Sequence, residues 1–307
     1  MYDCEAYLRD LAQSVEPSVT QKAAASRSHN YLREVLCTGQ FGARIRDSYL
    51  SGSYARDTAI SPIDDVDIVI VVDPSGWPCR FWADRPEPER ILRSFATAIR
   101  YRYRQSSVYV QRRSVRLRLY HLDIDVVPAL ETDGDSDRLE IPDADSDVWI
   151  KTAPRVHTRI ATEVNLARGG RFKPLVKLAK YWNTQLPQAS RLKSFAIETI
   201  AASVFRHVGI PTLQDGLRLF FDFLSARADE AVLYRWTQDY GIRLNGWGAQ
   251  VPDLAGTGSN LVATADTQRR QRFLEHAIRC RDALIRADRA RTPEHAIAHI
   301  RAALRMA

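Results

Sequence analysis

The chain has 307 residues, of which 45% are apolar and 26% are charged, a balance typical of a soluble globular protein with one large domain or two lobes. Its longest purely apolar run, residues 68–72, is too short to span a bilayer, and the first ten residues lack the pattern of a signal peptide. We therefore expect a cytoplasmic protein without a membrane partner.

The net charge is +7, and 38 of the 44 basic residues are arginines. This excess suits an anionic partner such as a nucleotide, although a solvated basic surface would give the same composition. The four cysteines are far apart and form no CxxC pair, so neither a zinc site nor a disulfide framework is expected.

The N-terminal half alternates between helical and strand-like patterns. Helical spacing of apolar residues predicts helices over residues 2–15, 20–37 and 86–100. Alternation predicts strands over 44–50, 65–73, 108–110, 115–119 and 122–127, the last three forming a half-exposed antiparallel sheet. The polar residues 133–137 are interpreted as a surface loop.

After about residue 155 the patterns become purely helical. They predict helices over residues 156–168, 173–186, 192–208, 213–226, 229–240, 264–287 and 293–305. The chain is thus expected to be α+β, with a mixed or antiparallel sheet in residues 1–155 and a helical lobe in residues 156–307. A cleft between two lobes is a natural place for a ligand.

Two acids open the predicted strand over 65–73. Asp65 and Asp67 are two residues apart, so in a strand both carboxylates face the same side. Adjacent carboxylates repel each other, and a divalent cation removes that cost. Magnesium is typically held by one or two carboxylates together with substrate phosphates, which predicts a metal site here, with Mn²⁺ as a possible substitute.

A second pair of acids, Asp123 and Asp125, opens another apolar strand. If that strand lies beside the first, Asp65, Asp67 and Asp125 meet at one sheet edge, which is the minimum for a two-metal phosphoryl-transfer site. Asp123 could share this duty, but a surface acid at the strand edge is the simpler interpretation. Alternatively, each acid caps a strand or pairs with an arginine, which explains any one of them but not the whole arrangement.

Gly52 and Ser53 follow the strand over 44–50 and precede a short predicted helix, residues 54–57. Glycine lets a phosphate approach the backbone, and a helix start offers unpaired N–H groups to anions. The Ser53 hydroxyl can donate a further hydrogen bond. The dipeptide becomes informative only together with the acids.

The stretches GSYARDTAI, DDVDI and DVVPA together resemble the nucleotidyltransferase superfamily that includes DNA polymerase beta. More narrowly, the chain resembles the bacterial cGAS/DncV-like nucleotidyltransferases. LVKLAKYWN and LKSFAIETIA resemble paired helix motifs of that family's C-terminal lobe, which is similar to that of oligoadenylate synthetase. VPDLAGTGSNL resembles a late loop of the family, where Asn260 matches and Leu261 replaces a second asparagine.

The resemblance implies roles for particular residues. Gly52, Ser53 and the three acids, Asp65, Asp67 and Asp125, would hold a donor nucleotide and two Mg²⁺ ions. On the helix motifs, Lys180 would bind the triphosphate, Ser194 would contact phosphates and Phe195 would stack on a base. Lys180 could instead be solvated and Phe195 could instead be core.

By resemblance, the chain is expected to join nucleoside triphosphates, ATP among them, into a cyclic di- or trinucleotide that activates a downstream effector in bacterial anti-phage (CBASS-type) signalling. A nucleic acid activator is not expected, because no zinc-binding insertion is present. The alternatives are a template-independent transferase acting on an RNA end, a tRNA or a protein, and a binding protein with a dead site. The helix motifs speak against the first, and the intact acids against the second.

Overall fold

The computed structural model describes residues 3–39, 41–77, 79, 85–132, 134–226, 239–245 and 248–305. Its contacts group residues 17–158 into one compact unit, the sheet unit, and residues 1–16 with 159–307 into another, the helical unit. A division between residues 155 and 156 remains a prediction. The expected helix over 229–240 lies largely outside the described residues.

The sheet unit is built around a mixed sheet. The described strands are β1 (Ile45–Ser51), β2 (Asp65–Val72), β3 (Ser107–Val110), β4 (Val115–Arg118), β5 (Asp123–Thr132), β6 (Asp135–Asp143) and β7 (Val148–Thr152). Their order is β1-β2-β5-β4-β3, with β6 pairing to β5 and to β7. β2 and β5 run parallel, whereas the other pairs are antiparallel. This arrangement confirms the expected α+β class.

One prediction is wrong in this unit. Residues 135–137, expected in a surface loop, begin β6. This strand pairs with β5 at Thr132↔Asp135 and again from Glu131↔Leu139, with a register irregularity between these two pairs. These first residues of β6 are largely exposed, so their side chains are polar and resemble those of a loop. The sequence carried no apolar signal for this strand start.

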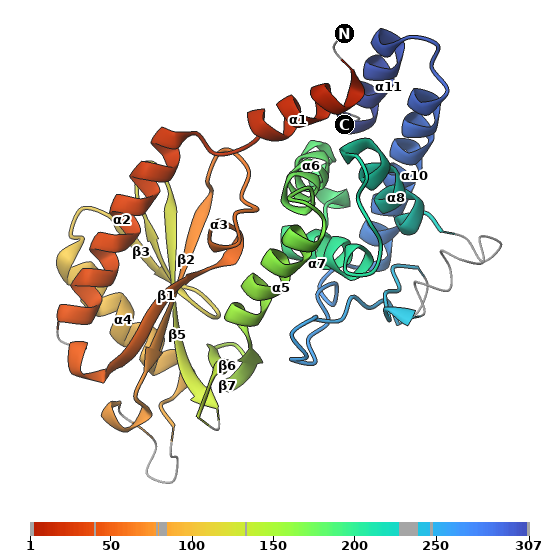
Figure 1. Ribbon diagram of the computed structural model, residues 1–307. Coiled ribbons are helices and arrows are strands. Elements are labelled where there is room, and N and C mark those ends of the chain that lie inside the picture. Colours follow the sequence, from red (N-terminus) through yellow and green to blue (C-terminus); the bar gives the residue numbers. More distant parts are fainter. Residues whose placement is uncertain are drawn as a thin grey trace. The chain divides into compact units, whose positions relative to one another are not determined.

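One face of the sheet is covered by the helices α2 (Val19–Thr38) and α4 (Pro88–Arg102) (Figure 1). α2 begins with a capping box, in which the Ser18 hydroxyl accepts from the Gln21 N–H and the Gln21 side chain accepts from the Ser18 N–H. The core beneath contains Leu32 from α2, Phe95 from α4 and Ile68 from β2, all fully buried. This burial fixes which face of β2 points inward.

The opposite face of the sheet carries a smaller apolar cluster of Val69, Val71, Ala129 and Leu139. Residues two apart in a strand share a face, so the face that carries Val69 also carries Asp67 and Asp65. The carboxylates therefore stand at one end of the sheet face that carries this smaller cluster.

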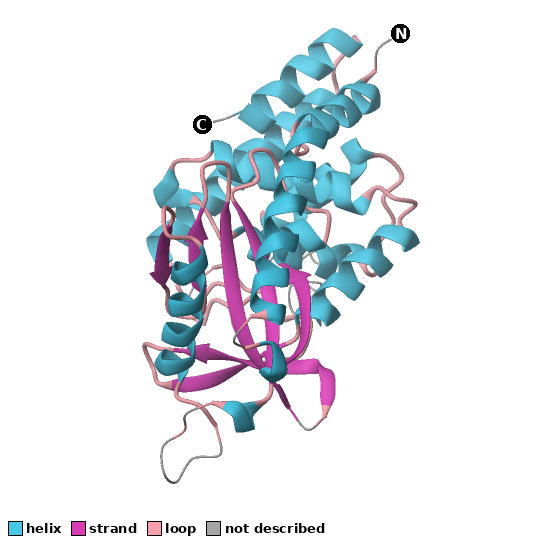
Figure 2. Ribbon diagram, turned by 90° about the vertical axis from the view of Figure 1, so that its left-hand side faces the viewer, coloured by secondary structure: helices cyan, strands magenta, loops and turns pink. Residues whose placement is uncertain are grey.

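The helical unit consists of helices and loops in the described part of the chain (Figure 2). Its helices are α1 (Cys4–Ser14), α5 (Pro154–Ala167, which begins in the sheet unit), α6 (Phe172–Gln185), α7 (Ser194–Phe205), α8 (Leu213–Leu224), α10 (Thr267–Asp288) and α11 (Pro293–Arg305). The buried Trp182 ring of α6 packs edge-on against Phe221 of α8 and Phe273 of α10. No described helix is both long and apolar enough to cross a bilayer.

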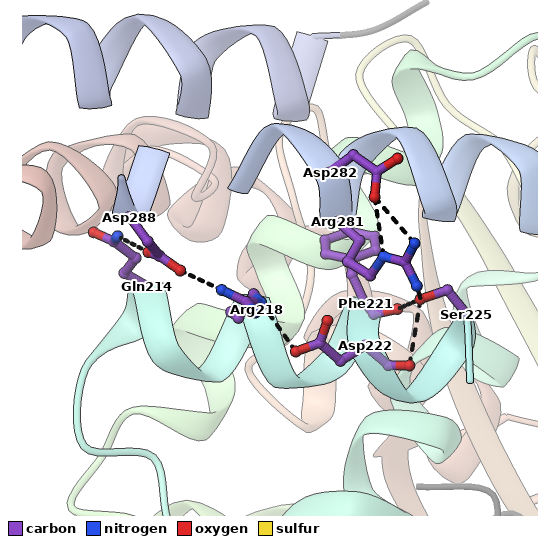
Figure 3. Close-up of polar contacts among 8 residues, drawn as sticks. All are labelled: Gln214, Arg218, Phe221, Asp222, Ser225, Arg281, Asp282 and Asp288. Carbon is purple, nitrogen blue, oxygen red and sulfur yellow. Dashed lines mark hydrogen bonds and ion pairs between the residues drawn. The ribbon is translucent and has the colours of Figure 1, made fainter. Parts of the chain in front are cut away.

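A line of polar contacts joins α8 to α10 at the edge of this core (Figure 3). Arg218 of α8 donates to Asp222 on its own helix and to Asp288 of α10, which also accepts from Gln214. Further along, Arg281 of α10 donates to the Ser225 hydroxyl at 3.1 Å. These partly exposed polar contacts therefore hold α8 and α10 together, in addition to the buried apolar contacts of the two helices.

Candidate active site

The acids meet where two parallel strands begin. β2 and β5 pair so that Asp67 lies opposite Asp125 and Asp65 opposite Asp123. Neighbouring strands are about 5 Å apart, which brings each pair of carboxylates close together on the same face. The condition that the two strands lie side by side is met, and the geometry depends on the parallel pairing of segments that lie nearly sixty residues apart.

Gly52 gives the Asp67 carboxylate the space that it occupies. Ser51, the last residue of β1, pairs with Asp67, and the short helix α3 (Gly52–Ala55) follows directly. A Cβ placed on Gly52 would lie 1.9 Å from Oδ2 of Asp67, and the Gly52 φ of +71° is in the left-handed region that favours glycine. Gly52 is therefore in direct contact with the Asp67 carboxylate.

The electrostatics of the acids are unfavourable without a cation. Burial, reinforced by the charges of Asp65 and Asp125, raises the pKa of Asp67 to about 7. Partial burial and the charge of Asp125 also raise the pKa of Asp65. Both shifts reflect mainly the free energy needed to keep a carboxylate ionised away from water, and the neighbouring carboxylates add to it.

Arg116 of β4 is a functional candidate that the sequence reasoning missed. It lies opposite Asp125 in the antiparallel β4–β5 register and donates to both carboxylate oxygens, from Nε at 2.9 Å and from Nη2 at 2.6 Å. Its Nη2 is also 3.6 Å from Asp65, and its Nη1 is 3.4 Å from Asp123. Because Val115 and Leu117 are buried in the core, alternation along β4 puts Arg116 on the opposite face, but only the strand pairing shows that this face carries the acids.

The residues present fit a divalent cation in their chemistry. Carboxylate oxygens are hard ligands of the kind that Mg²⁺ prefers, and Asp65, Asp67 and Asp125 supply them from two adjacent strands. In the described residues, however, no three aspartate, glutamate, histidine or cysteine side chains are placed so that they could hold a metal ion together. Both oxygens of Asp125 are instead bound by Arg116.

The nucleotide-contact residues expected from the helix motifs lie in the helical unit. Lys180 on α6 is 3% exposed, Ser194 is an exposed residue that begins α7, and the adjacent Phe195 is partly buried. The buried Lys177, three residues before Lys180, forms an ion pair with Glu16 at 2.7 Å. The roles of Lys180, Ser194 and Phe195 remain predictions.

The loop over residues 251–261 is stabilised by the side chain of its own Asn260. Asn260 accepts hydrogen bonds from the N–H groups of Val251 and Val262, both at 3.1 Å, and donates to the carbonyl of Ala249 at 2.9 Å. The side chain therefore has a structural role in shaping this loop.

The sheet, the paired carboxylates and the glycine turn define the polymerase-beta-like class of nucleotidyltransferase fold. A family profile described as "Second Messenger Oligonucleotide or Dinucleotide Synthetase domain" matches residues 3–165. The chain belongs to this family, which confirms the resemblance to bacterial cGAS/DncV-like nucleotidyltransferases.

Individual relatives agree with this assignment. A cyclic AMP-AMP-AMP synthase from an Acinetobacter species is 35% identical over 203 residues, which cover 63% of this chain and 56% of the relative. The chain thus matches little more than half the length of that curated relative. Among solved structures, Escherichia coli CdnC with ATP has a TM-score of 0.75 at 21% identity, covering 99% of this chain and 98% of that one. Bradyrhizobium diazoefficiens CdnG with GTP has a TM-score of 0.73 at 15% identity, covering 98% and 94%. The two structures show a shared fold.

Proposed function

We propose that the chain is a metal-dependent nucleotidyltransferase that joins nucleoside triphosphates, ATP among them, into a cyclic oligonucleotide. The observation that carries the proposal is the register of β2 and β5, which sets Asp67 opposite Asp125, with Gly52 against Asp67. Membership of a family of second-messenger synthetases supports it, as does the similarity to a cyclic AMP-AMP-AMP synthase.

In this reaction the hydroxyl of one nucleotide attacks the α-phosphate of another and pyrophosphate leaves. Asp65, Asp67 and Asp125 would hold the two cations. Ser53 would donate to the phosphates that Gly52 allows to approach the backbone. Bound Mg²⁺ supplies neutralisation of the triphosphate charge and makes the attacking hydroxyl more acidic.

The contacts beyond the acids belong to the same proposal. Lys180 would bind the triphosphate, Ser194 would contact the phosphates and Phe195 would stack on a base. The product would act on a downstream effector in bacterial anti-phage signalling, and the protein would be cytoplasmic. A cyclic trinucleotide made from ATP is the product that the curated relative's name suggests.

The test is incubation of the full chain with all four ribonucleoside triphosphates and Mg²⁺, with and without RNA, followed by phosphatase and chromatography. We expect small phosphatase-resistant products that do not require RNA. The matched variants are Asp67→Asn and Asp125→Asn, which remove a charge with little change of shape and should abolish the products.

The other outcomes decide between the alternatives. Elongated RNA without small products would favour an RNA-end transferase. Absence of turnover with the wild-type chain under every nucleotide and cation condition, including Mn²⁺, would favour a binding protein and overturn the proposal.

A further inference from the structure

A single guanidinium group contacts three of the four acids at the strand edge. Arg116 binds Asp125 through two hydrogen bonds and lies within 3.6 Å of Asp65 and 3.4 Å of Asp123. Two parallel N–H···O bonds between an arginine and a carboxylate are among the strongest hydrogen bonds in proteins. The positive charge that neutralises Asp125 in this arrangement is therefore the guanidinium group of Arg116.

The position of Arg116 is fixed by the strand that carries it. Val115 and Leu117, on either side, are both 0% exposed and anchor β4 in the core beneath the sheet. Arg116 must therefore face the side that carries the acids, directly opposite Asp125. Its side chain is 24% exposed, so the contact is partly shielded from water.

The next outward-facing residue of the strand provides a comparison. Arg118 carries the same charge on the same face, but among the acids of the described residues it reaches only Asp123, at 3.5 Å, and its side chain is 58% exposed. Its guanidinium lies over the ring of Tyr109. The contacts that Arg116 makes with the acids are therefore specific to its position and do not follow from the positive charge of β4 in general.

We propose that Arg116 is the resident counter-cation of Asp125 and that it competes with the divalent cation for this carboxylate. Arg116 occupies both oxygens of Asp125, and its charge repels a second cation nearby. A triphosphate offsets that repulsion and offers the guanidinium a new anionic partner. The site therefore binds its cation weakly by itself and more tightly together with the nucleotide, a coupling that rests on the function proposed above.

The experiment measures Mn²⁺ binding to the purified full chain without nucleotide, from the paramagnetic resonance signal of unbound Mn²⁺. The variants are Arg116→Gln, which removes the charge, Arg116→Lys, which keeps the charge but loses the two-point contact, and Arg118→Gln as the matched control. We expect Arg116→Gln to bind Mn²⁺ roughly tenfold more tightly than the wild type, because a unit charge within a few ångströms of a divalent cation is removed. Arg116→Lys should show a smaller gain, which keeps the test informative if the glutamine variant does not fold, and Arg118→Gln should leave the affinity nearly unchanged.

A second measurement adds a non-hydrolysable ATP analogue and follows thermal stability. Mn²⁺ with the analogue should raise the Tm of the wild type by more than the two separate increases combined, and Arg116→Gln should reduce this excess.

Unchanged Mn²⁺ affinity in both Arg116 variants, or an equal gain in Arg118→Gln, would overturn the inference and leave the proposed function intact. Absence of Mn²⁺ binding in every protein, with or without the analogue, would overturn both the inference and the metal site, and the product assay would then decide the function separately.

Discussion

Replacing Gly52 with alanine tests the contact between the glycine turn and the acid site. The new Cβ would lie 1.9 Å from Oδ2 and 2.9 Å from Cγ of Asp67. Unbonded heavy atoms normally stay about 3.5 Å apart, so the Asp67 carboxylate, or the turn itself, must move by roughly 1.5 Å. A displacement of about 1 Å in a catalytic group can reduce a rate about 100-fold. We therefore expect Gly52→Ala to lower product formation by about 100-fold.

A second, smaller effect acts on stability, and a matched control separates it from the first. A φ of +71° costs an L-residue about 1–2 kcal/mol of folding free energy. Gly134 has the same φ of +71°, but a Cβ there would meet no atom of the described residues within 4 Å. Gly134→Ala should thus lose a similar amount of stability and keep its activity.

The assay combines steady-state product formation with urea unfolding of both variants. The expected result is a comparable loss of unfolding free energy in the two proteins and a loss of activity in Gly52→Ala alone. If Gly52→Ala keeps a rate close to that of Gly134→Ala, the contact with Asp67 does not position that carboxylate and the reasoning is refuted.

Three further predictions concern other parts of the chain. Burial opposes ionisation of Asp143, but hydrogen bonds from two arginines outweigh it and hold its pKa below the usual value. Its folded pKa is below its unfolded one, so this stabilisation is intact above the ordinary pKa of about 3.9 and is lost as pH falls through the lowered value. Asp143→Asn should cost about 2–3 kcal/mol at pH 7 and almost nothing in strong acid, as measured by urea unfolding at both pH values. Asn183→Ala should destabilise the helical unit by roughly 2–4 kcal/mol, because the buried Asn183 side chain pairs with both the N–H and the carbonyl of Leu192; a Tm within a degree of wild type would contradict this. Phe195→Ala should raise the KM for nucleotide with little change in Tm if the ring stacks on a base, whereas a lower Tm with an unchanged KM would assign the ring to packing.

The positions of the main elements could be read from the sequence because their signals are local. The alternation before Gly52 and the apolar run after Asp67 predicted β1 and β2 to within a residue or two. Helical spacing likewise predicted α2 and α4, with ends within about two residues. Neither β6 nor β7 was predicted. The first residues of β6 are exposed and polar and form a strand only through pairing with β5.

The sequence by itself determined which residues can do the chemistry. Asp65 and Asp67 are two residues apart in a strand, so their side chains share one face. The apolar residues next to each acid lie on the other face, which is the core face, so the acids face outward. The sequence also singled out Gly52 and Asp125. Strand periodicity and side-chain chemistry account for the pair Asp65 and Asp67, whereas the choice of Asp125 over Asp123 rests on the resemblance to the family.

Only the tertiary structure decided which of these residues touch. The parallel register sets Asp125 beside Asp67, the turn after β1 places Gly52 against the Asp67 carboxylate, and the antiparallel register sets Arg116 across from Asp125. The physical reason is that strand pairing is set by non-local hydrogen bonds and by burial of the opposite face, neither of which is written in the periodicity of one segment. An arginine that the sequence alone placed on an outward face thereby becomes the counter-cation of the acid site.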